Sequence, residues 1–286
     1  MIWIRASINL VIFTSFLLLS PNIISSQELV FKKRGEVVKK LSLDQIEKII
    51  APKTVTVFEP HESENRQYRG FPVDKLFTAV YGDDWIKTEE ILFTCSDGYE
   101  ATIPSSQFRK YSSYLVYAIP GRKEFTLINR LQNNELVELG PFYLVWDNIH
   151  NPELKAEGGS GWPYQVVWVD LINFSDRFPN TAPPKNSPDE VKNGFRAFRQ
   201  YCMTCHSING EGGTKSVELN YPVSVTEYMK EKWLYRWIDN PQSIRYNTTM
   251  PALNPQTKDR DRLIKDIIAY LKAMKSNKIK PVSETK

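Results

Sequence analysis

The chain has 286 residues with 37 basic and 33 acidic side chains, so its formal net charge is +4. Because this excess is small and the two signs are mixed along the chain, the composition does not indicate a nucleic-acid partner. The length is sufficient for two domains after removal of a leader.

Residues 1–26 have the layout of a secretory signal peptide. One positive charge, at Arg5, precedes an apolar run over residues 8–19, and two serines end the segment. We predict cleavage before residue 27 or 28 and export to the periplasm. The alternative is an uncleaved anchor that would attach the protein to a membrane, but the run is shorter than the roughly 20 apolar residues that span a bilayer.

Residues 28–178 predict a strand-rich α+β domain. Segments rich in β-branched and aromatic residues and bounded by turn residues are typical of strands. They are residues 54–58, 90–95, 114–118, 142–146 and 165–174. We expect two short helices, at residues 43–50 behind Ser42 and at residues 73–81. The domain contains no internal repeat and no glycine-rich phosphate loop.

Four stretches of this domain resemble, in the same order, segments of a known family. They are YRGFPVDKL at Tyr68–Leu76, SDGYEATIP at Ser96–Pro104, GPFYLVW at Gly140–Trp146 and QVVWVD at Gln165–Asp170. In this order they resemble the molybdopterin-binding domain of the sulfite oxidase family, which implies that family's fold. The family's molybdenum-binding thiolate precedes the Gly-Phe-Pro element, where this chain has Val57-Phe58-Glu59-Pro60. We therefore expect the fold without molybdopterin.

The remaining candidates of this domain are one cysteine and two histidines. Cys95 ends a predicted strand, so we expect a buried structural thiol, and the chain then has no internal disulfide because its other cysteines belong to one motif. His61, Glu62 and His150 are an alternative small site. Single histidines and carboxylates in polar loops are usually solvated, which disfavours that alternative.

Residues 179–186, PNTAPPKN, predict a semi-rigid proline-rich linker between two domains. We expect a helical domain at residues 187–276 and a flexible tail at residues 277–286. The glycine-rich loop at residues 157–162 is expected to lie at the surface, and contact with the other domain is the alternative.

Cys202-Met203-Thr204-Cys205-His206 has the C-x-x-C-H spacing of a c-type haem attachment site. The two cysteines can each form a thioether to one porphyrin, and the adjacent His206 then reaches its iron. A structural zinc site needs four ligands, and a redox C-x-x-C pair needs no neighbouring histidine. The sequence therefore predicts one covalently bound haem c, held by Cys202 and Cys205.

The helix leading into this motif has a clear expected start. Ser187 is the predicted N-cap, Pro188 the first helical residue, and Glu190 the residue that closes a capping box. An apolar stripe then recurs at helical spacing, at Val191, Phe195, Phe198 and Cys202. With Gly194, this helix resembles the first helix of the class I cytochrome c family, which carries glycine, an aromatic residue and the first haem cysteine four positions apart.

The resemblance also indicates the second axial ligand. The family's sixth ligand lies in a Met-Pro loop, and Met250-Pro251 occupies such a loop here. A thioether ligand raises the haem potential, as expected for electron transfer. Met229 lies in a charged helical stretch, so we expect it at the surface or in packing, and Met274 lies on the apolar face of the last helix, so we expect it in the core.

Two further helices are expected to complete this all-α domain. The helix at residues 261–275 should pack across the first, with Gly194 permitting close approach, and the one at residues 231–239 should form a wall of the haem pocket. Trp233, Arg245 and Tyr246 either hydrogen-bond the haem propionates or lie exposed. The family's Gly-Pro-x-Leu element is not clear here. The sequence therefore does not identify the backbone carbonyl that orients the His206 ring.

The sequence therefore predicts an exported, two-domain c-type cytochrome and favours an electron carrier over an enzyme. It would exchange single electrons with redox partner proteins at an exposed thioether edge beside Cys202 and Cys205, with His206 and Met250 as axial ligands. Two alternatives stay open. One is a molybdopterin-dependent, sulfite oxidase-like dehydrogenase with a fused haem domain, and the other is a haem-based sensor in which a small ligand displaces Met250.

Overall fold

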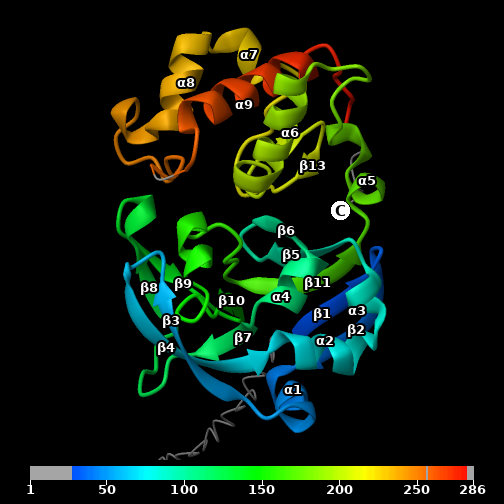
Figure 1. Ribbon diagram of the computed structural model, residues 1–286, viewed down its shortest axis with the longest axis vertical. Helices are drawn as coiled ribbons and strands as arrows, with labels where there is room; N and C mark the ends of the chain where they lie inside the picture. Colours follow the sequence, from blue (N-terminus) through cyan, green and yellow to red (C-terminus); the bar gives the residue numbers. More distant parts are fainter. Residues whose placement is uncertain (1–27, 256, 282–286) are drawn as a thin grey trace, which may run out of the picture.

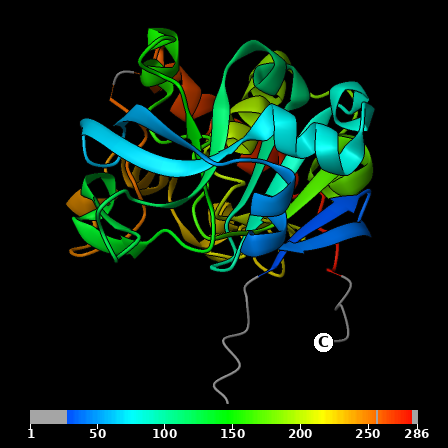
Figure 2. The ribbon, with the colours of Figure 1, turned by 90° about the horizontal axis from the view of Figure 1, so that it is seen from below.

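The computed structural model describes residues 28–255 and 257–281, which form two bodies stacked along the long axis (Figure 1). The predicted signal peptide lies outside the described residues. Figure 2 shows the strands of the first body in front and the helices of the second body behind them. Within the described ranges, none of the helices combines the length and apolar character needed to cross a membrane.

The first body is built on two sheets. The larger has the order β2 (Glu36–Ser42), β1 (Glu28–Lys33), β11 (Val166–Ile172), β5 (Glu90–Cys95) and β6 (Glu100–Pro104). Its pairs are antiparallel except β1 with β11, which are parallel. The second sheet has the antiparallel order β10 (Tyr143–Trp146), β7 (Ser113–Ala118), β4 (Glu64–Pro72) and β3 (Lys53–Glu59). A separate hairpin joins β8 (Thr126–Asn129) to β9 (Glu135–Glu138).

Four short α-helices lie between these strands in the described part of the chain, and a fifth follows the last strand. They are α1 (Leu43–Ile49), α2 (Val73–Tyr81), α3 (Asp84–Lys87), α4 (Ser105–Lys110) and α5 (Phe174–Arg177). Aromatic rings from α2, β5, α4 and β10 meet in the core of this body, with centroids 4.8 Å apart for Phe108 and Trp146 and 5.8 Å apart for Phe93 and Phe108. Because β5 and β10 belong to different sheets, this aromatic contact joins the two sheets.

The predicted elements of the first body are all present. Each of the five predicted strands overlaps an observed strand, and the two predicted helices are α1 and α2. Ser42 caps α1 as expected: its hydroxyl accepts from the Gln45 amide at 3.3 Å, and the Gln45 side chain accepts from the Ser42 amide at 2.8 Å. Strands β1, β2, β4 and β6 and the β8–β9 hairpin were not predicted.

The second body contains α6 (Asp189–Tyr201), α7 (Val225–Tyr228), α8 (Glu231–Asp239) and α9 (Arg260–Met274). A small hairpin of β12 (Ser207–Ile208) and β13 (Glu211–Gly212) departs from the all-α prediction. The predicted capping box of α6 is wrong. Its N-cap is Pro188, because the Ser187 hydroxyl instead donates to the Pro184 carbonyl at 2.7 Å.

The predicted semi-rigid linker and the described part of the predicted flexible tail both pack against the second body. In the predicted linker, Thr181 is buried and its carbonyl accepts from the Tyr270 hydroxyl at 2.6 Å. In the described part of the predicted tail, the Ile279 amide donates to the Asn209 side chain at 3.1 Å. Lys278 pairs with Glu227 at 2.5 Å. These contacts fix the position of both segments on the second body.

Helices α6 and α9 cross at Gly194, as predicted. A Cβ atom at Gly194 would overlap the Asp266 carbonyl of α9 and would lie 3.0 Å from the Tyr270 Cβ. The α9 stripe that faces this crossing is buried as expected, at Ile264, Ile267, Ile268, Leu271 and Met274. The absence of a side chain at position 194 therefore sets the distance between the two helices.

Gly194→Ala is expected to destabilise the protein even though alanine favours helix formation. The added methyl must push α6 from α9, and overpacking of this kind costs about 1–3 kcal/mol. Denaturant unfolding of the variant measures this loss. Gln200→Ala, at an exposed position of the same helix, is the control and should leave the free energy of unfolding within about 0.5 kcal/mol of wild type. Equal stability of the two variants would contradict the prediction.

Candidate haem site

The C-x-x-C-H motif forms one tight turn at the end of α6. The amides of Cys205 and His206 both donate to the Cys202 carbonyl, at 3.1 and 2.9 Å. The three side chains are half-buried and both thiols are free. Burial raises the pKa of Cys202 to about 12 and also raises the pKa of Cys205. The turn therefore places two protonated thiols and an imidazole together, as attachment of one haem requires.

The His206 ring is held in one tautomer. Its Nδ1 lies 2.8 Å from the Val217 carbonyl oxygen, which can only accept, so Nδ1–H donates and Nε2 keeps its lone pair. Burial lowers the pKa of His206, which favours the neutral ring. A neutral imidazole with a free Nε2 is the form that binds a metal, and a carbonyl on Nδ1 is the usual orienting contact. The carbonyl left open by the sequence is thus that of Val217.

Several apolar or aromatic side chains of the second body are exposed to solvent over a large part of their surface. Val217 is 61% exposed, Trp233 41% and Tyr246 89%. Val217 also supplies the carbonyl bound by His206, so exposed apolar surface lies directly beside the imidazole. A porphyrin bound at His206 would cover the exposed side of Val217. The residues present therefore fit a haem.

Met250 lies in the predicted loop and is half-buried, and its amide donates to the Thr248 hydroxyl at 3.3 Å. Arg260 of α9 anchors the end of this loop by donating to the Leu253 carbonyl at 3.1 Å. The other two methionines downstream of the motif are accounted for by packing, since Met274 is fully buried and Met229 packs against the core of the second body. Met250 therefore stays the predicted axial ligand.

The expected exposed edge beside Cys202 and Cys205 is partly covered, because the first body packs against the C-x-x-C-H turn. The Glu100 amide donates to the carbonyl of Thr204, between the two cysteines, at 2.8 Å. The Gly98 carbonyl accepts from the Thr214 amide at 2.8 Å. Gly98 has φ +86°, and a Cβ there would lie 2.6 Å from the Thr214 hydroxyl. Only glycine therefore fits at position 98.

The alternative site of His61, Glu62 and His150 is not formed. His61 is buried against Glu59, Glu62 pairs with Arg66 at 2.5 Å, and His150 is exposed beside Asp147. Among residues 28–255 and 257–281, no group of three or more histidines, cysteines or carboxylates could hold a metal ion.

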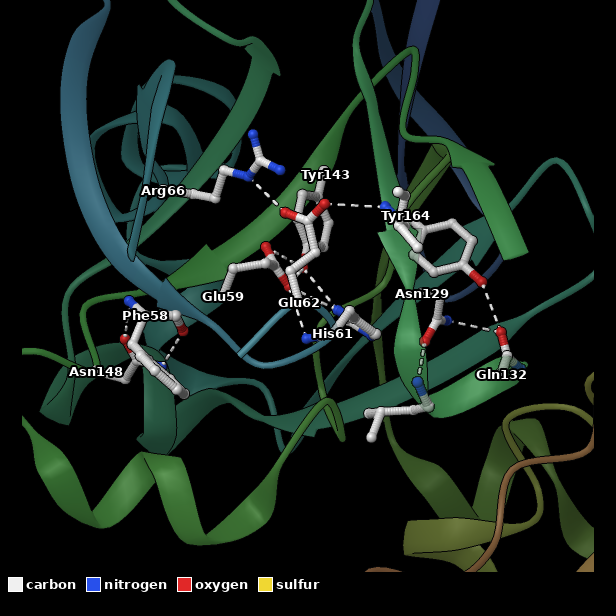
Figure 3. A network of polar contacts seen from close by, with 12 residues as sticks. Phe58, Glu59, His61, Glu62, Arg66, Asn129, Gln132, Tyr143, Asn148 and Tyr164 are labelled. Carbon is white, nitrogen blue, oxygen red and sulfur yellow. Dashed lines mark hydrogen bonds and ion pairs between the residues drawn. The ribbon is translucent and has the colours of Figure 1, made fainter. Parts of the chain in front are cut away.

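Sequence reasoning missed Glu59, which is fully buried in the first body. Figure 3 shows Glu59 beside His61 and Tyr143. Its carboxylate accepts from His61 Nδ1 and from the Tyr68 hydroxyl, both at 2.7 Å, and from the Tyr143 hydroxyl at 3.1 Å. Burial alone would raise the pKa of Glu59, but the hydrogen bonds and charge of His61 lower it overall. The burial of Glu59 could have been predicted from strand alternation, because side chains two residues apart lie on the same face and Val57 is an apolar residue of the same strand.

Residues 191–275 match the family model for cytochrome c. The match includes the C-x-x-C-H motif and extends from α6 to α9. This region is thus a cytochrome c domain, which implies a covalently bound haem, a role in electron transfer and redox partner proteins. No curated protein matches the chain.

Proposed function

We propose that the protein is an exported c-type cytochrome that carries single electrons between partner proteins in the periplasm. One haem would be attached through Cys202 and Cys205 and ligated by His206 and Met250. The observation that carries the proposal is the His206 ring, whose Nδ1–H is bound by the Val217 carbonyl while Nε2 stays available. The location is supported by the leader-like sequence of residues 1–26 and by the extracytoplasmic setting typical of cytochrome c domains.

When bound, the haem supplies a one-electron couple between ferrous and ferric iron. The chain's own residues determine how that couple behaves. The Val217 carbonyl fixes the imidazole orientation and raises its basicity as a ligand. Leu234, Ile238 and Leu253 are buried and would form an apolar wall that keeps water from the haem. An apolar setting favours the less charged ferrous state, and a thioether from Met250 would favour it further.

Covalent attachment is tested by the mass of the denatured holoprotein, expressed in a host that matures c-type cytochromes. The expected mass exceeds that of the polypeptide by one haem. The double variant Cys202→Ala, Cys205→Ala should lose this added mass completely. Cys95→Ala removes a cysteine that is 3% exposed in the first body, and it should keep the haem. A wild-type protein without covalent haem would overturn the proposal.

For the first body, we propose a sulfite oxidase-type fold without its molybdenum cofactor. Its sequence stretches in family order support the fold, while Glu59 stands near the expected thiolate position and binds His61. Cys95 is buried, which raises its thiol pKa and disfavours the thiolate that metal binding needs. Elemental analysis of the holoprotein should find iron and no molybdenum. Near-stoichiometric molybdenum would instead support the dehydrogenase alternative.

A further inference from the structure

We propose that Asp97 and Lys215 are positioning residues through which the first body sets the orientation of the His206 imidazole and thereby the redox potential of the haem. This inference rests on the haem-binding function proposed above. It concerns the segment Thr214–Val217, which lies between the C-x-x-C-H turn and the first body. The segment touches both of them through hydrogen bonds of its backbone.

On the haem side, two contacts tie this segment to the motif. The Val217 carbonyl accepts from His206 Nδ1 at 2.8 Å, and the Ser216 amide donates to the Cys205 carbonyl at 2.8 Å. The segment belongs to no helix or strand. The position of the Val217 carbonyl is therefore not fixed by regular structure, and it depends on what holds the neighbouring residues.

On the other side, the first body holds Thr214 and Lys215. Both amides donate to the Gly98 carbonyl, at 2.8 and 3.2 Å. The Lys215 ammonium donates to the Asp97 carboxylate at 2.6 Å and to the Tyr164 hydroxyl at 3.1 Å. The side chains of Lys215 and Asp97 are only 26% and 21% exposed. This charge-assisted pair is thus partly shielded from water and stronger than a surface ion pair.

The two sets of contacts form a continuous connection from Asp97 to the imidazole. Lys215 is two residues from Val217, so a shift of the lysine backbone moves the carbonyl that orients His206. The hydrogen bond on Nδ1 controls the basicity of an iron-bound imidazole, and contacts of this kind tune haem potentials. The first body would therefore influence the haem without contributing a ligand to the iron.

The test is the midpoint potential of the full-length holoprotein carrying Lys215→Met or Asp97→Asn. A direct effect of charge predicts opposite shifts, because one variant removes a positive charge and the other a negative one. A positioning role predicts shifts in the same direction, since both variants release the same segment. It also predicts faster hydrogen exchange of the Thr214 and Lys215 amides in both. We expect the positioning outcome.

Two further variants serve as controls. Lys272→Met removes a lysine of the same domain from an exposed pair with Glu231, with side-chain exposures of 51% and 61%, and should leave the potential and the exchange unchanged. Lys215→Arg keeps the ion pair and should stay close to wild type, which guards against a general loss of folding. Each variant is first checked for covalent haem by mass.

The outcomes separate this inference from the proposed function. A wild-type protein without haem would overturn both. If Lys215→Met and Asp97→Asn load haem but shift the potential in opposite directions, the positioning role is overturned. The same holds if their potentials shift no more than the potential of Lys272→Met. In both cases the cytochrome function stands. Slow exchange at Thr214 and Lys215 in every variant would also overturn the positioning role.

Discussion

Replacing Met250 with leucine is expected to lower the haem midpoint potential and to abolish the red absorption band that ferric haem shows when a thioether binds its iron. Leucine has a similar volume and no sulfur, so the loop keeps its packing but loses the ligand. Axial ligands set haem potentials over a range of roughly 0.8 V, and we expect a loss on the order of a tenth of that range or more. Redox titration and ferric spectra measure both effects.

Met229→Leu is the matched control for this substitution. Met229 is a partly buried methionine of the same domain that packs against the core, so its loss should change neither the potential nor the band. The ferrous Met250→Leu protein should also bind carbon monoxide, because one axial position is open. A retained band in Met250→Leu would assign the ligand elsewhere. Rapid carbon monoxide binding by the wild type would favour the ligand-sensor alternative.

The sequence predicted well those helices whose position is determined by residues close together in the chain. Each apolar stripe, on α6 and on α9, can be read from the residues of its own helix. Together with the glycine at position 194, the two stripes were sufficient to predict that the helices cross. The helix behind Ser42 was predicted correctly, whereas the capping box predicted at Ser187 is not formed. The difference is a competing acceptor, since the Pro184 carbonyl binds the Ser187 hydroxyl and a sequence pattern does not reveal this contact.

Contacts between distant segments were not predictable in the same way. Strand β1 pairs in parallel with β11, near the other end of the first body, and the Gly98 carbonyl binds the Thr214 amide of the second body. Both contacts depend on tertiary packing and leave no periodic pattern in either segment. The same holds for the Val217 carbonyl, which lies 11 residues from His206 in an irregular segment. The haem motif was therefore evident from the sequence, while its supporting contacts were not.

Glu59→Gln is expected to lower the free energy of unfolding by about 3 kcal/mol at neutral pH, because an amide cannot accept from all the donors that the buried carboxylate binds and leaves a buried donor unpaired. Glutamine has nearly the same shape, so the effect reports the loss of the carboxylate acceptor, which lies 2.7 Å from His61 Nδ1, and not a cavity. The Tyr68 and Tyr143 hydroxyls, whose pKa values burial raises, would stay protonated donors in both proteins.

The effect of Glu59→Gln should depend on pH with a defined sign. Although burial opposes ionisation, the contacts with His61 lower the pKa of folded Glu59 below its usual value of 4.5. Its stabilisation is therefore fully present above that value and is lost as pH falls through the lower, folded pKa. Denaturant unfolding across this range should show the wild type approaching the variant in acid. Glu64→Gln is the control, since Glu64 lies at the start of β4 with a side chain 50% exposed and should cost less than about 1 kcal/mol at any pH. A pH-independent difference between wild type and Glu59→Gln would show that the buried carboxyl is not ionised in the folded protein.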